Sequence, residues 1–372
     1  MKKIFEFVTA LVMTVFWGAF CTAGYGGEEW PTFRGGVSRT GEVTSQTAQA
    51  QYRARGGVVW ETYVQQPIQS SPALSDGIVY FGSDDGGFYA VSAASGEALW
   101  TFHTENWISS SPAVSGETVL FGAYDGKLYA LDKRSGNLKW QYTTHNSVAS
   151  SPAVEGKYVY FGGLDGSVYC VDISTGWQKW TYNAGREVFG SPAVSGGTVY
   201  IGNHDGKMMA VDASTGKLKW RAIVGGPITA CPAVSNGMLY FGSWDGKLYT
   251  AEIKHQAVIR NFDSGGSIES SPLVADGRVY FGNIKGTLYA IDAATGKAAW
   301  KVETGARIAS SPALSDGVIY FGNDNGSIYA VDAQSGAVLW KSDTGGAVAT
   351  APAIAPNGIY VTAMDGALRY IK

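Results

Sequence analysis

The sequence predicts an all-β fold: an eight-bladed β-propeller of four-stranded antiparallel blades, closed by an N-terminal strand that completes the last blade. Three observations carry this prediction. A Ser-Pro motif recurs every 40 residues, each repeat contains four short runs of branched and aromatic residues, and glycine, the residue of tight turns, makes up 50 of the 372 residues. Four strands in a repeat of this length are typical of propeller blades. The repeated proline occurs at Pro72, Pro112, Pro152, Pro192, Pro232, Pro272, Pro312 and Pro352.

Each repeat is expected to form strands A to D, ordered from the central axis outward. Strand A follows the Ser-Pro motif, strand B reads like Val-Tyr-Phe-Gly, strand C like Leu-Tyr-Ala-Val-Asp, and strand D carries a tryptophan. Asp-Gly pairs such as Asp125-Gly126, between strands B and C, supply the positive φ angles of hairpin turns. Strands that are apolar on both faces imply sheets that are covered on both sides. The blades should therefore stack face to face around a ring.

The two ends of the chain indicate how the ring closes. Trp60 has the strand D signature but precedes the first Ser-Pro motif, whereas the chain ends at Lys372 in a strand C that no strand D follows. Residues 58–64 are therefore expected to complete the eighth blade, which removes the exposed sheet edges of an open ring. The propeller is assigned to residues 57–372.

The N-terminal residues differ in composition from the repeats. Two lysines precede an apolar run that ends in small residues, so residues 1–23 are expected to be a secretory signal peptide, followed by a lead-in segment, residues 24–56. An uncleaved membrane anchor and a lipidated Cys21 are the alternatives, and Phe20 directly before Cys21 argues against lipidation. Cys170 and Cys231 lie in different repeats, at positions where other repeats have Ala or Ser, which favours two separate buried thiols over a disulfide.

The charge balance narrows the range of partners. The formal net charge is −3, with 28 basic and 31 acidic residues, which gives no strong positive field for nucleic acid. The hydrophobic content of 45% and aromatic content of 13% exclude a disordered chain. The protein is expected to be monomeric and to associate with a membrane only through a partner or through lipidation.

Two motifs resemble those of a known family. Residues 210–220, Ala-Val-Asp-Ala-Ser-Thr-Gly-Lys-Leu-Lys-Trp, resemble the tryptophan-docking repeat of eight-bladed quinoprotein (PQQ) propellers. Residues 30–35, Trp-Pro-Thr-Phe-Arg-Gly, with Arg-Thr-Gly at 39–41, resemble the lead-in of PQQ-like repeat proteins. The family includes PQQ-dependent alcohol dehydrogenases and BamB, a non-catalytic scaffold of outer-membrane β-barrel assembly. The resemblance implies tryptophans that dock adjacent blades, at Trp60, Trp100, Trp140, Trp180, Trp220, Trp300 and Trp340.

The residues that the dehydrogenases of this family need are not recognisable. Those enzymes use a vicinal cysteine pair, a catalytic aspartate and carboxylate or amide ligands for calcium, mostly on insertions, whereas this sequence has no Cys-Cys pair and leaves no room for insertions in its 40-residue repeats. There is no haem-attachment motif, and the four histidines lie in different repeats without metal-ligand spacing. No catalytic residue, metal ligand or cofactor is therefore assigned; PQQ with calcium is the alternative.

Recurrent polar residues have structural explanations. Serines such as Ser109, Ser110 and Ser111 recur beside the repeated proline and are expected to pack strands rather than to act as nucleophiles. Aspartates at the end of strand C are expected to bond the amides of the following Ser/Thr-Gly turn. These aspartates are Asp132, Asp172, Asp212, Asp292 and Asp332.

Comparison of the repeats with one another locates a candidate interaction face. Residues that vary between repeats are concentrated in the B–C turns and the D–A connections, which emerge on the same face of a propeller, whereas the A–B and C–D turns are nearly uniform. Aromatic residues and arginine are enriched at binding hot spots. The predicted partner-binding residues are Trp107, Tyr124, His145, Asn146, Arg186, Glu187, His204, Trp244, Glu269 and Arg307, with Glu269 expected to point towards the central channel. Neutral drift of loop tips is the alternative.

One repeat departs from the pattern. In the fifth repeat, residues 252–260 read Glu-Ile-Lys-His-Gln-Ala-Val-Ile-Arg and lack both the glycine and the tryptophan of the other repeats. The expected consequence is weaker contact between the fifth and sixth blades.

These observations favour a non-enzymatic, exported propeller scaffold, periplasmic or associated with the cell envelope, that binds an envelope protein as BamB does. The alternative function is a PQQ-binding or small-molecule-binding propeller with redox activity. Carbohydrate or cell-wall binding and a purely structural role are further alternatives.

Overall fold

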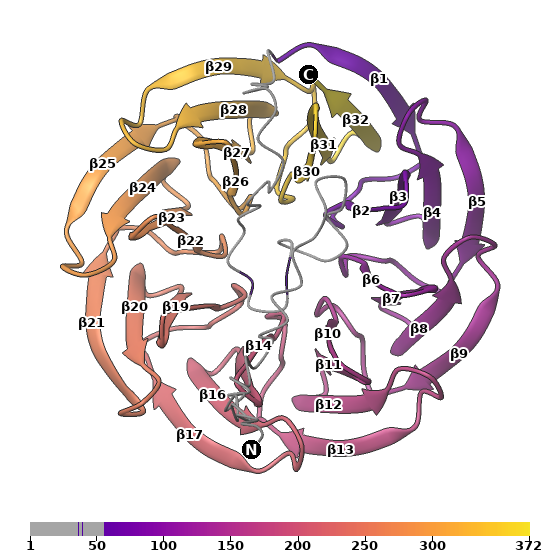
Figure 1. Cartoon of the computed structure of the whole chain (residues 1–372), viewed down its shortest axis with the longest axis horizontal. Helices are drawn as coiled ribbons and strands as arrows, with labels where there is room; N and C mark the ends of the chain where they lie inside the picture. The colour runs from indigo at the N-terminus through magenta and orange to yellow at the C-terminus, as the bar shows by residue number, and fades with distance from the viewer. Residues whose placement is uncertain (1–35, 37–38, 40–55) are drawn as a thin grey trace, which may run out of the picture.

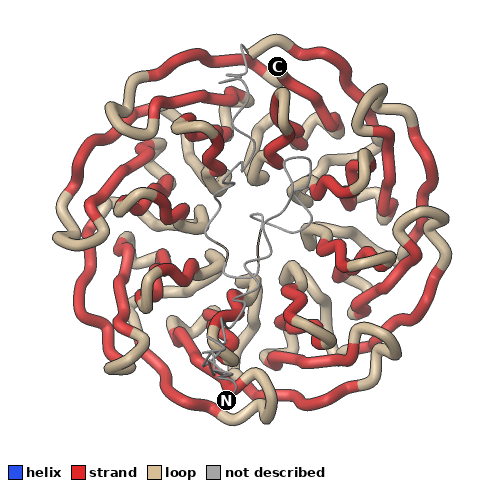
Figure 2. The backbone as a smooth tube through the Cα atoms, viewed as in Figure 1, coloured by secondary structure: helices blue, strands red, loops and turns tan. Residues whose placement is uncertain are grey.

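The computed structural model describes Gly36, Arg39 and residues 56–372. The predicted signal peptide, Cys21 and nearly all of the lead-in segment lie outside the described residues and stay predictions. The described chain forms 32 strands in eight four-stranded antiparallel sheets, which are arranged as blades around a central axis (Figures 1 and 2). This confirms the predicted fold class.

Within each blade, strands A to D are ordered from the axis outward, in sequence order except in the closing blade, whose outermost strand is β1. The innermost strands, A, are β2 (Ala73–Ser75), β6 (Ala113–Ser115), β10 (Ala153–Glu155), β14 (Ala193–Ser195), β18 (Ala233–Ser235), β22 (Leu273–Ala275), β26 (Ala313–Ser315) and β30 (Ala353–Ala355). Strands B are β3 (Ile78–Gly82), β7 (Thr118–Gly122), β11 (Tyr158–Gly162), β15 (Thr198–Gly202), β19 (Met238–Gly242), β23 (Arg278–Gly282), β27 (Val318–Gly322) and β31 (Gly358–Thr362).

The outer two layers complete the blades. Strands C are β4 (Gly87–Ser92), β8 (Lys127–Asp132), β12 (Ser167–Asp172), β16 (Lys207–Asp212), β20 (Lys247–Glu252), β24 (Thr287–Asp292), β28 (Ser327–Asp332) and β32 (Ala367–Ile371). Strands D, on the rim, are β5 (Ala98–His103), β9 (Leu138–Thr143), β13 (Gln178–Asn183), β17 (Leu218–Ile223), β21 (Ala257–Asp263), β25 (Ala298–Glu303), β29 (Val338–Asp343) and β1 (Val58–Tyr63). Blades are numbered 1 to 8 from the one that begins with β2.

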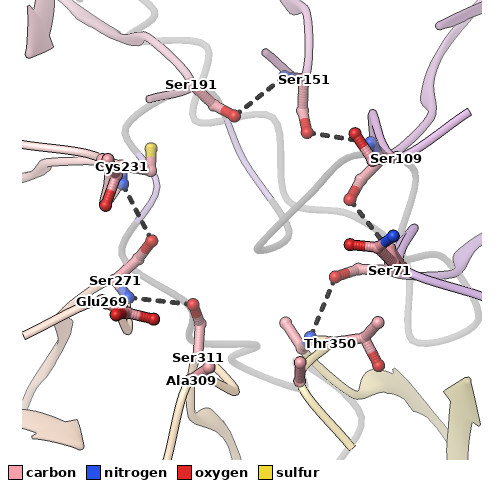
Figure 3. A pocket seen from close by; sticks show the side chains of 15 residues that line it. Ser71, Ser109, Ser151, Ser191, Cys231, Glu269, Ser271, Ala309, Ser311 and Thr350 are labelled. Carbon is pink, nitrogen blue, oxygen red and sulfur yellow. Dashed lines mark hydrogen bonds between the residues drawn. The ribbon is translucent and has the colours of Figure 1, made fainter. Parts of the chain in front are cut away.

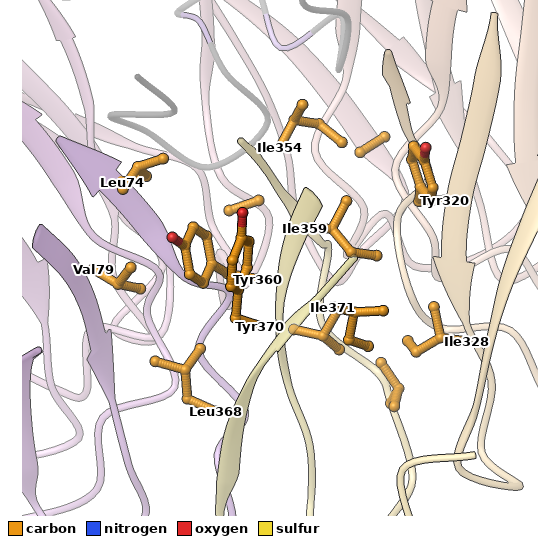
Figure 4. Packing of buried hydrophobic residues seen from close by; sticks show 14 of the residues in the cluster. Leu74, Val79, Tyr320, Ile328, Ile354, Ile359, Tyr360, Leu368, Tyr370 and Ile371 are labelled. Atoms are coloured by element: carbon orange, nitrogen blue, oxygen red, sulfur yellow. The ribbon is translucent and has the colours of Figure 1, made fainter. Parts of the chain in front are cut away.

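The N-terminal strand closes the ring as the sequence predicts. Strand β1 pairs antiparallel with β32, so that blade 8 has the order β1-β32-β31-β30. Side chains of the closing blade, including Tyr360 and Leu368, pack in one core with Leu74 of blade 1 and Ile328 of blade 7 (Figure 4). Closure therefore buries apolar surface on both sides of the seam. Burying one such side chain stabilises the fold by about 1.5–3 kcal/mol.

Glycine at the end of strand B permits close stacking of neighbouring blades. A Cβ atom on Gly82 would lie 2.1 Å from Cγ2 of Ile108, which leads into the next blade. The same crowding recurs at Gly122, Gly162, Gly202, Gly242, Gly282 and Gly322. Part of the glycine excess is therefore a packing requirement between blades and not only a requirement of turns.

Most rim tryptophans lie against a glycine of the following blade, usually the glycine of its C–D turn. A Cβ atom on Gly136, whose φ is +72°, would lie 2.6 Å from Cε3 of Trp100, and the indole Nε1 of Trp100 donates to the carbonyl oxygen of Lys133 at 3.2 Å. The indole therefore covers backbone that only glycine leaves accessible. Equivalent ring-on-glycine contacts join Trp60 to Gly96, Trp140 to Gly176, Trp180 to Gly216, Trp300 to Gly336 and Trp340 to Gly56.

The fifth blade keeps a contact at this place with different residues, and the expected weakening of the contact stays a prediction. Gln256, in place of glycine, adopts a φ of +54°. Arg260, in place of tryptophan, lies against Gly296 of blade 6, and its Nη1 donates to the carbonyl oxygen of Ala293 at 3.0 Å. A long aliphatic stem with a guanidinium head reproduces both the apolar cover and the hydrogen bond of an indole.

Candidate functional site

The two variable loop sets lie side by side on one face of the ring. In every blade, the N–H of the residue before the B–C turn pair donates to a carbonyl oxygen of the D–A connection that enters that blade. Tyr124 donates to Trp107 at 2.9 Å, His204 to Glu187 at 2.9 Å, and Trp244 to Pro227 at 3.0 Å. These bonds hold the backbone of the two loop sets together in every blade.

One aromatic pair on this face joins blades 1 and 2. The rings of Trp107 and Tyr124 are tilted, with centroids 6.1 Å apart, and Trp107 is 54% exposed. Beside them is a pocket of about 220 Å³ whose lining includes Asp84, Asp85 and Glu105 together with Trp107. A largely exposed indole that packs beside a tyrosine ring is suited to packing against another molecule.

A second aromatic cluster joins blades 4 and 5. The rings of His204 and Trp244 meet edge to face with centroids 5.5 Å apart, and the ring of Phe189 is tilted against that of His204 with centroids 5.7 Å apart. The indole Nε1 of Trp244 donates to Oγ1 of Thr229 at 2.9 Å, which fixes the ring while leaving it 41% exposed. The structure thus brings the predicted residues His204 and Trp244 together.

Phe189 and Thr229 were missed by the sequence prediction. Both occupy the position that follows the D–A connection by one apolar residue, and this position varies between repeats just as the predicted ones do. The predicted Glu269 occupies the same position in the sixth repeat, so the variation at this position was the signal that could have identified Phe189 and Thr229.

The remaining predicted residues lie on the same face but serve different local contacts. His145, Asn146 and Arg186 are exposed, whereas Glu187 is half-buried. The side-chain oxygen of Asn146 accepts from the N–H of Ser147 at 2.7 Å. These four side chains lie between the two aromatic groups along the chain and add polar groups to the face.

Glu269 and Arg307 form an ion pair at the mouth of the central channel. Glu269 lines the channel pocket, as predicted, and its carboxylate accepts from the guanidinium of Arg307, which also binds Oδ2 of Asp324 at 3.1 Å. Burial lowers the pKa of Arg307 and the two carboxylates raise it, with a net upward effect. The predicted acidic residue of the channel is therefore neutralised by a second predicted residue.

The channel itself is lined by a ring of serines (Figure 3). The N–H of Ser71 donates to Oγ of Ser111 in the next blade at 3.0 Å, and five further links of the same kind are present. They run from Ser111 to Ser151, Ser151 to Ser191, Cys231 to Ser271, Ser271 to Ser311 and Ala351 to Ser71. The hydroxyl groups therefore join blades at the axis, which confirms their expected structural role.

The described lining of the channel does not fit calcium-bound PQQ. The pocket has a volume of about 180 Å³ and its lining is mainly serine hydroxyl and alanine methyl groups. The carboxylate of Glu269 is engaged by Arg307, and within residues 56–372 no cluster of three or more His, Cys, Asp or Glu side chains could hold a metal ion. A metal and a quinone that carries carboxylates both need charged partners, which this lining does not offer.

Two further predictions concern polar and sulfur groups. The strand C aspartates bind the following turn as expected: Oδ1 of Asp212 accepts from the N–H groups of Ser214 and Thr215 at 3.1 and 2.9 Å. Cys170 and Cys231 are separate buried thiols. Burial raises the pKa of Cys170 to about 12.

The opposite face is less uniform than the sequence comparison suggested. Trp177, in the C–D turn of blade 3, is 78% exposed, more than either tryptophan of the variable face. It stands alone at a position where other repeats have small or polar residues.

Solved structures show the same fold. BamB from Moraxella catarrhalis is 21% identical, with a TM-score of 0.73 over 85% of this chain and 99% of that chain. The computationally designed Ika8 protein is also 21% identical, with a TM-score of 0.74 over 83% of this chain and 97% of that one. Quinohemoprotein alcohol dehydrogenase from Comamonas testosteroni is 16% identical, with a TM-score of 0.80 over 94% and 81%. At these identities the likeness concerns the fold alone.

Sequence comparisons identify the family. No curated protein matches the chain. In the described part of the chain there is no helix that could span a membrane. Residues 45–236, 192 of the 372 residues, match the family model of the β-propeller of beta-alanine-activating enzyme, and residues 214–313 and 284–372 match that of outer membrane protein assembly factor BamB. Because the first match spans more than half of the chain and the second continues to its end, the chain belongs to the family of PQQ-like β-propellers that these two models describe.

Proposed function

We propose that this protein is a non-enzymatic scaffold that is exported to the cell envelope and binds a protein partner there through its variable face. The observation that carries the proposal is the pair of exposed aromatic groups on that face, Trp107 with Tyr124 and Trp244 with His204. The predicted signal peptide and the match to the model of an outer membrane assembly factor support the location.

Physical chemistry favours these two groups as anchors. Tryptophan and tyrosine present large apolar areas, lose little conformational freedom on binding, and dominate the energetics of many interfaces. Trp107 and Trp244 are 54% and 41% exposed although neighbouring groups hold them in place. Leaving such surface in water is unfavourable by roughly 25 cal/mol per Å², and a partner would recover that free energy by covering it.

Charged residues around the anchors would set the specificity of the interface. Arg186, Glu187 and His145 lie on blade-connecting loops of the same face. Charges of both signs at the edge of an interface steer a partner and fix its orientation more than they add affinity. The protein would act as a monomer and reach the membrane through its partner.

The experiment compares capture by three forms of the exported protein. A photo-crosslinker placed at Asn146, on the variable face, should give a discrete crosslinked species in the envelope. The double variant Trp107→Ala with Trp244→Ala should lose this species at an unchanged Tm, because both rings are substantially exposed.

Trp177→Ala supplies the matched control. It removes an even more exposed indole from the opposite face, and the crosslinked species should persist. Persistence of the species in the double variant, or its loss in the Trp177→Ala variant, would contradict the assignment of the binding face.

A further inference from the structure

A pocket lies between blades 6 and 7 on the face opposite the variable face, where the A–B and C–D turns emerge. Its volume of about 400 Å³ falls within the range of small-molecule sites, roughly 300–1,000 Å³. The residues of its lining include Asp276 and Arg278 of blade 6, and Gly317, Ala333 and Gln334 of blade 7. A pocket that contains both an acidic and a basic side chain can select a ligand by its charges.

Between blades 1 and 2, five repeats earlier, the chain itself fills the same place. The side chain of Lys133 is only 7% exposed, and its Nζ lies 2.7 Å from Oδ2 of Asp76 and 3.5 Å from Oε1 of Glu117. Nη2 of Arg134 lies 3.5 Å from the same oxygen of Asp76. Because a buried charge needs charged partners, this junction is an ammonium site that a lysine of the protein occupies.

Three replacements open the pocket between blades 6 and 7. The aspartate of the ammonium site is kept as Asp276. The lysine, the glutamate and the arginine are replaced by Ala333, Gly317 and Gln334, respectively. In the described part of the chain, Asp276 forms no ion pair that would take the place of the lysine. The carboxylate of an ammonium site therefore lines an open pocket without its cation.

Arg278 adds a positive charge to this pocket. No other repeat has a charged residue at the equivalent position. Nη1 of the half-buried Arg278 donates to the carbonyl oxygens of Ala333 and Gln334 at 2.8 and 2.7 Å. These bonds anchor the guanidinium to blade 7 and leave Nε and Nη2 outside them. The planar donor fork of a guanidinium is suited to binding a carboxylate.

The charges of the pocket match those of an amino acid. Asp332, which also lines it, accepts with Oδ1 from the N–H and the hydroxyl group of Ser335 at 2.8 and 2.7 Å, as other strand C aspartates bind their turns. A bare ammonium beside Asp276 would also meet the positive charge of Arg278, and a bare carboxylate beside Arg278 would meet Asp276. A zwitterion can place each of its charges beside the opposite one, which makes both interactions attractive.

We propose that the pocket between blades 6 and 7 binds the zwitterionic head of a free amino acid, with the ammonium at Asp276 and the carboxylate at Arg278. The ammonium would take the place that Lys133 fills between blades 1 and 2. The site lies on the opposite face of the ring, so the inference does not depend on the proposed partner.

Ligand-observed NMR titration of the full chain with L-alanine tests the site. L-Alanine consists of the zwitterionic head and one methyl group, and it should bind with a millimolar dissociation constant. N-Acetyl-L-alanine lacks the ammonium and L-alaninamide lacks the carboxylate, so each should bind at least about tenfold more weakly. Failure of L-alanine to bind at tens of millimolar, or equal binding of either analogue, would overturn the proposal.

Ala333→Lys closes the site with the residue that blades 1 and 2 use. The introduced ammonium should pair with Asp276, so L-alanine should bind at least about tenfold more weakly at a Tm that is not lowered. Arg278→Gln should weaken L-alanine binding to a similar degree, because the partner of the carboxylate is lost. Unchanged binding in folded Ala333→Lys protein would place L-alanine elsewhere and overturn the site.

Two exposed positions provide a second variant and a control. Asp276→Asn removes the partner of the ammonium at an exposed residue, so it should fold and lose L-alanine binding even if the variants of buried positions do not fold. Arg221→Ala removes an exposed arginine from rim strand β17 and should bind L-alanine like the unmodified protein. Equal binding by the Asp276→Asn and Arg221→Ala proteins would contradict the proposal.

The junction of blades 1 and 2 tests the separate role of Arg278. Lys133→Ala should lower the Tm, because Asp76 and Glu117 lose the cation between them. n-Propylammonium, the fragment that this substitution removes, should restore part of the loss. L-Alanine should not restore it, since this junction has Ile78 at the position of Arg278. Equal rescue by both compounds would overturn the assignment of Arg278 as the partner of the carboxylate.

Discussion

Arg369 on the last strand lies directly opposite Glu61 on the first, and its Nε is 3.2 Å from Oε2 of Glu61. The same guanidinium binds the carboxylate of Asp365 and lies over the ring of Tyr63. Other repeats have tyrosine at this position, or methionine in one case. The arginine is therefore specific to the seam, where it ties together strands that are joined by no chain connection.

Removing Arg369 should destabilise the closed ring. Its side chain is only 6% exposed, and its loss leaves Asp365 and Glu61 without the cation between them. Arg369→Ala is expected to lower the free energy of unfolding by about 2–4 kcal/mol, measured by urea denaturation. Lys301→Ala breaks an ion pair with Glu303 that is fully exposed to solvent and should leave the urea midpoint unchanged. An equal effect of the two variants would show that the seam pair has no special role.

Alanine substitutions at two glycines should distinguish the cost of backbone strain from the cost of crowding against an indole ring. Gly136 and Gly77 have φ angles of +72° and +73°, but a Cβ on Gly136 would meet Trp100 whereas a Cβ on Gly77 would meet nothing within 4 Å. Gly77→Ala should cost about 1–2 kcal/mol, the strain of a left-handed residue. Gly136→Ala should cost clearly more in the same denaturation assay. Equal losses would mean that the tryptophan moves aside freely and contributes little to blade docking.

The serine ring can be extended at one blade. Ala351 stands where six repeats have serine, and it offers no side-chain oxygen to the N–H of Ser311. Ala351→Ser is expected to add the missing link and to raise the free energy of unfolding by about 0.5–1.5 kcal/mol. Ala349→Ser places a hydroxyl on the same pocket wall but outside the ring, and should have little effect. A gain of the same size in both variants would argue against the ring as the cause.

Acid should weaken the C–D turns in a defined way. Hydrogen bonds from Ser214, then from Thr215 and Lys219, hold the pKa of Asp212 below its usual value of 3.8. Because the pKa of Asp212 is lower in the folded than in the unfolded protein, its ionised carboxylate stabilises the fold above pH 3.8. This stabilisation is lost as the pH falls through the folded-state pKa. Asp212→Asn should therefore be less stable than the unmodified protein at pH 6, by less than about 1 kcal/mol because the group is partly exposed to solvent.

At pH 2.5 or below, the difference between the two proteins should be smaller than at pH 6. Urea midpoints of both proteins across this range provide the measurement. A constant difference at all pH values would assign the effect of Asp212→Asn to the shape of the turn instead of to the charge of Asp212.

The channel should not respond to the family cofactor. Its described lining offers serine hydroxyls and a carboxylate already paired with Arg307. PQQ with calcium is expected to leave both the Tm of the protein and the absorption spectrum of the quinone unchanged. A rise in Tm together with a spectral shift would overturn the non-enzymatic function and favour the redox alternative.

Much of the architecture was predictable because the sequence repeats. A 40-residue period with a tryptophan before the first motif, and no rim strand after the last, is sufficient to predict eight blades and the pairing of β1 with β32. The same period predicts that variable loops share one face, since equivalent residues occupy equivalent places in every blade. At Gln256 and Arg260, which replace Gly and Trp, the repeat pattern alone does not show that a different side chain contacts the next blade.

By itself, then, the sequence determined the strands, their order, the closure of the ring and the face on which its variation lies, because these depend on local patterns that recur eight times. The tertiary structure decided which side chains meet. Phe189 packs on His204, Arg369 joins Glu61, and Arg39 binds the carbonyls of Pro152 and Pro192. Such contacts join groups that occur once in the chain, and their partners are set by the curvature of the ring and the spacing between blades, which no local pattern encodes.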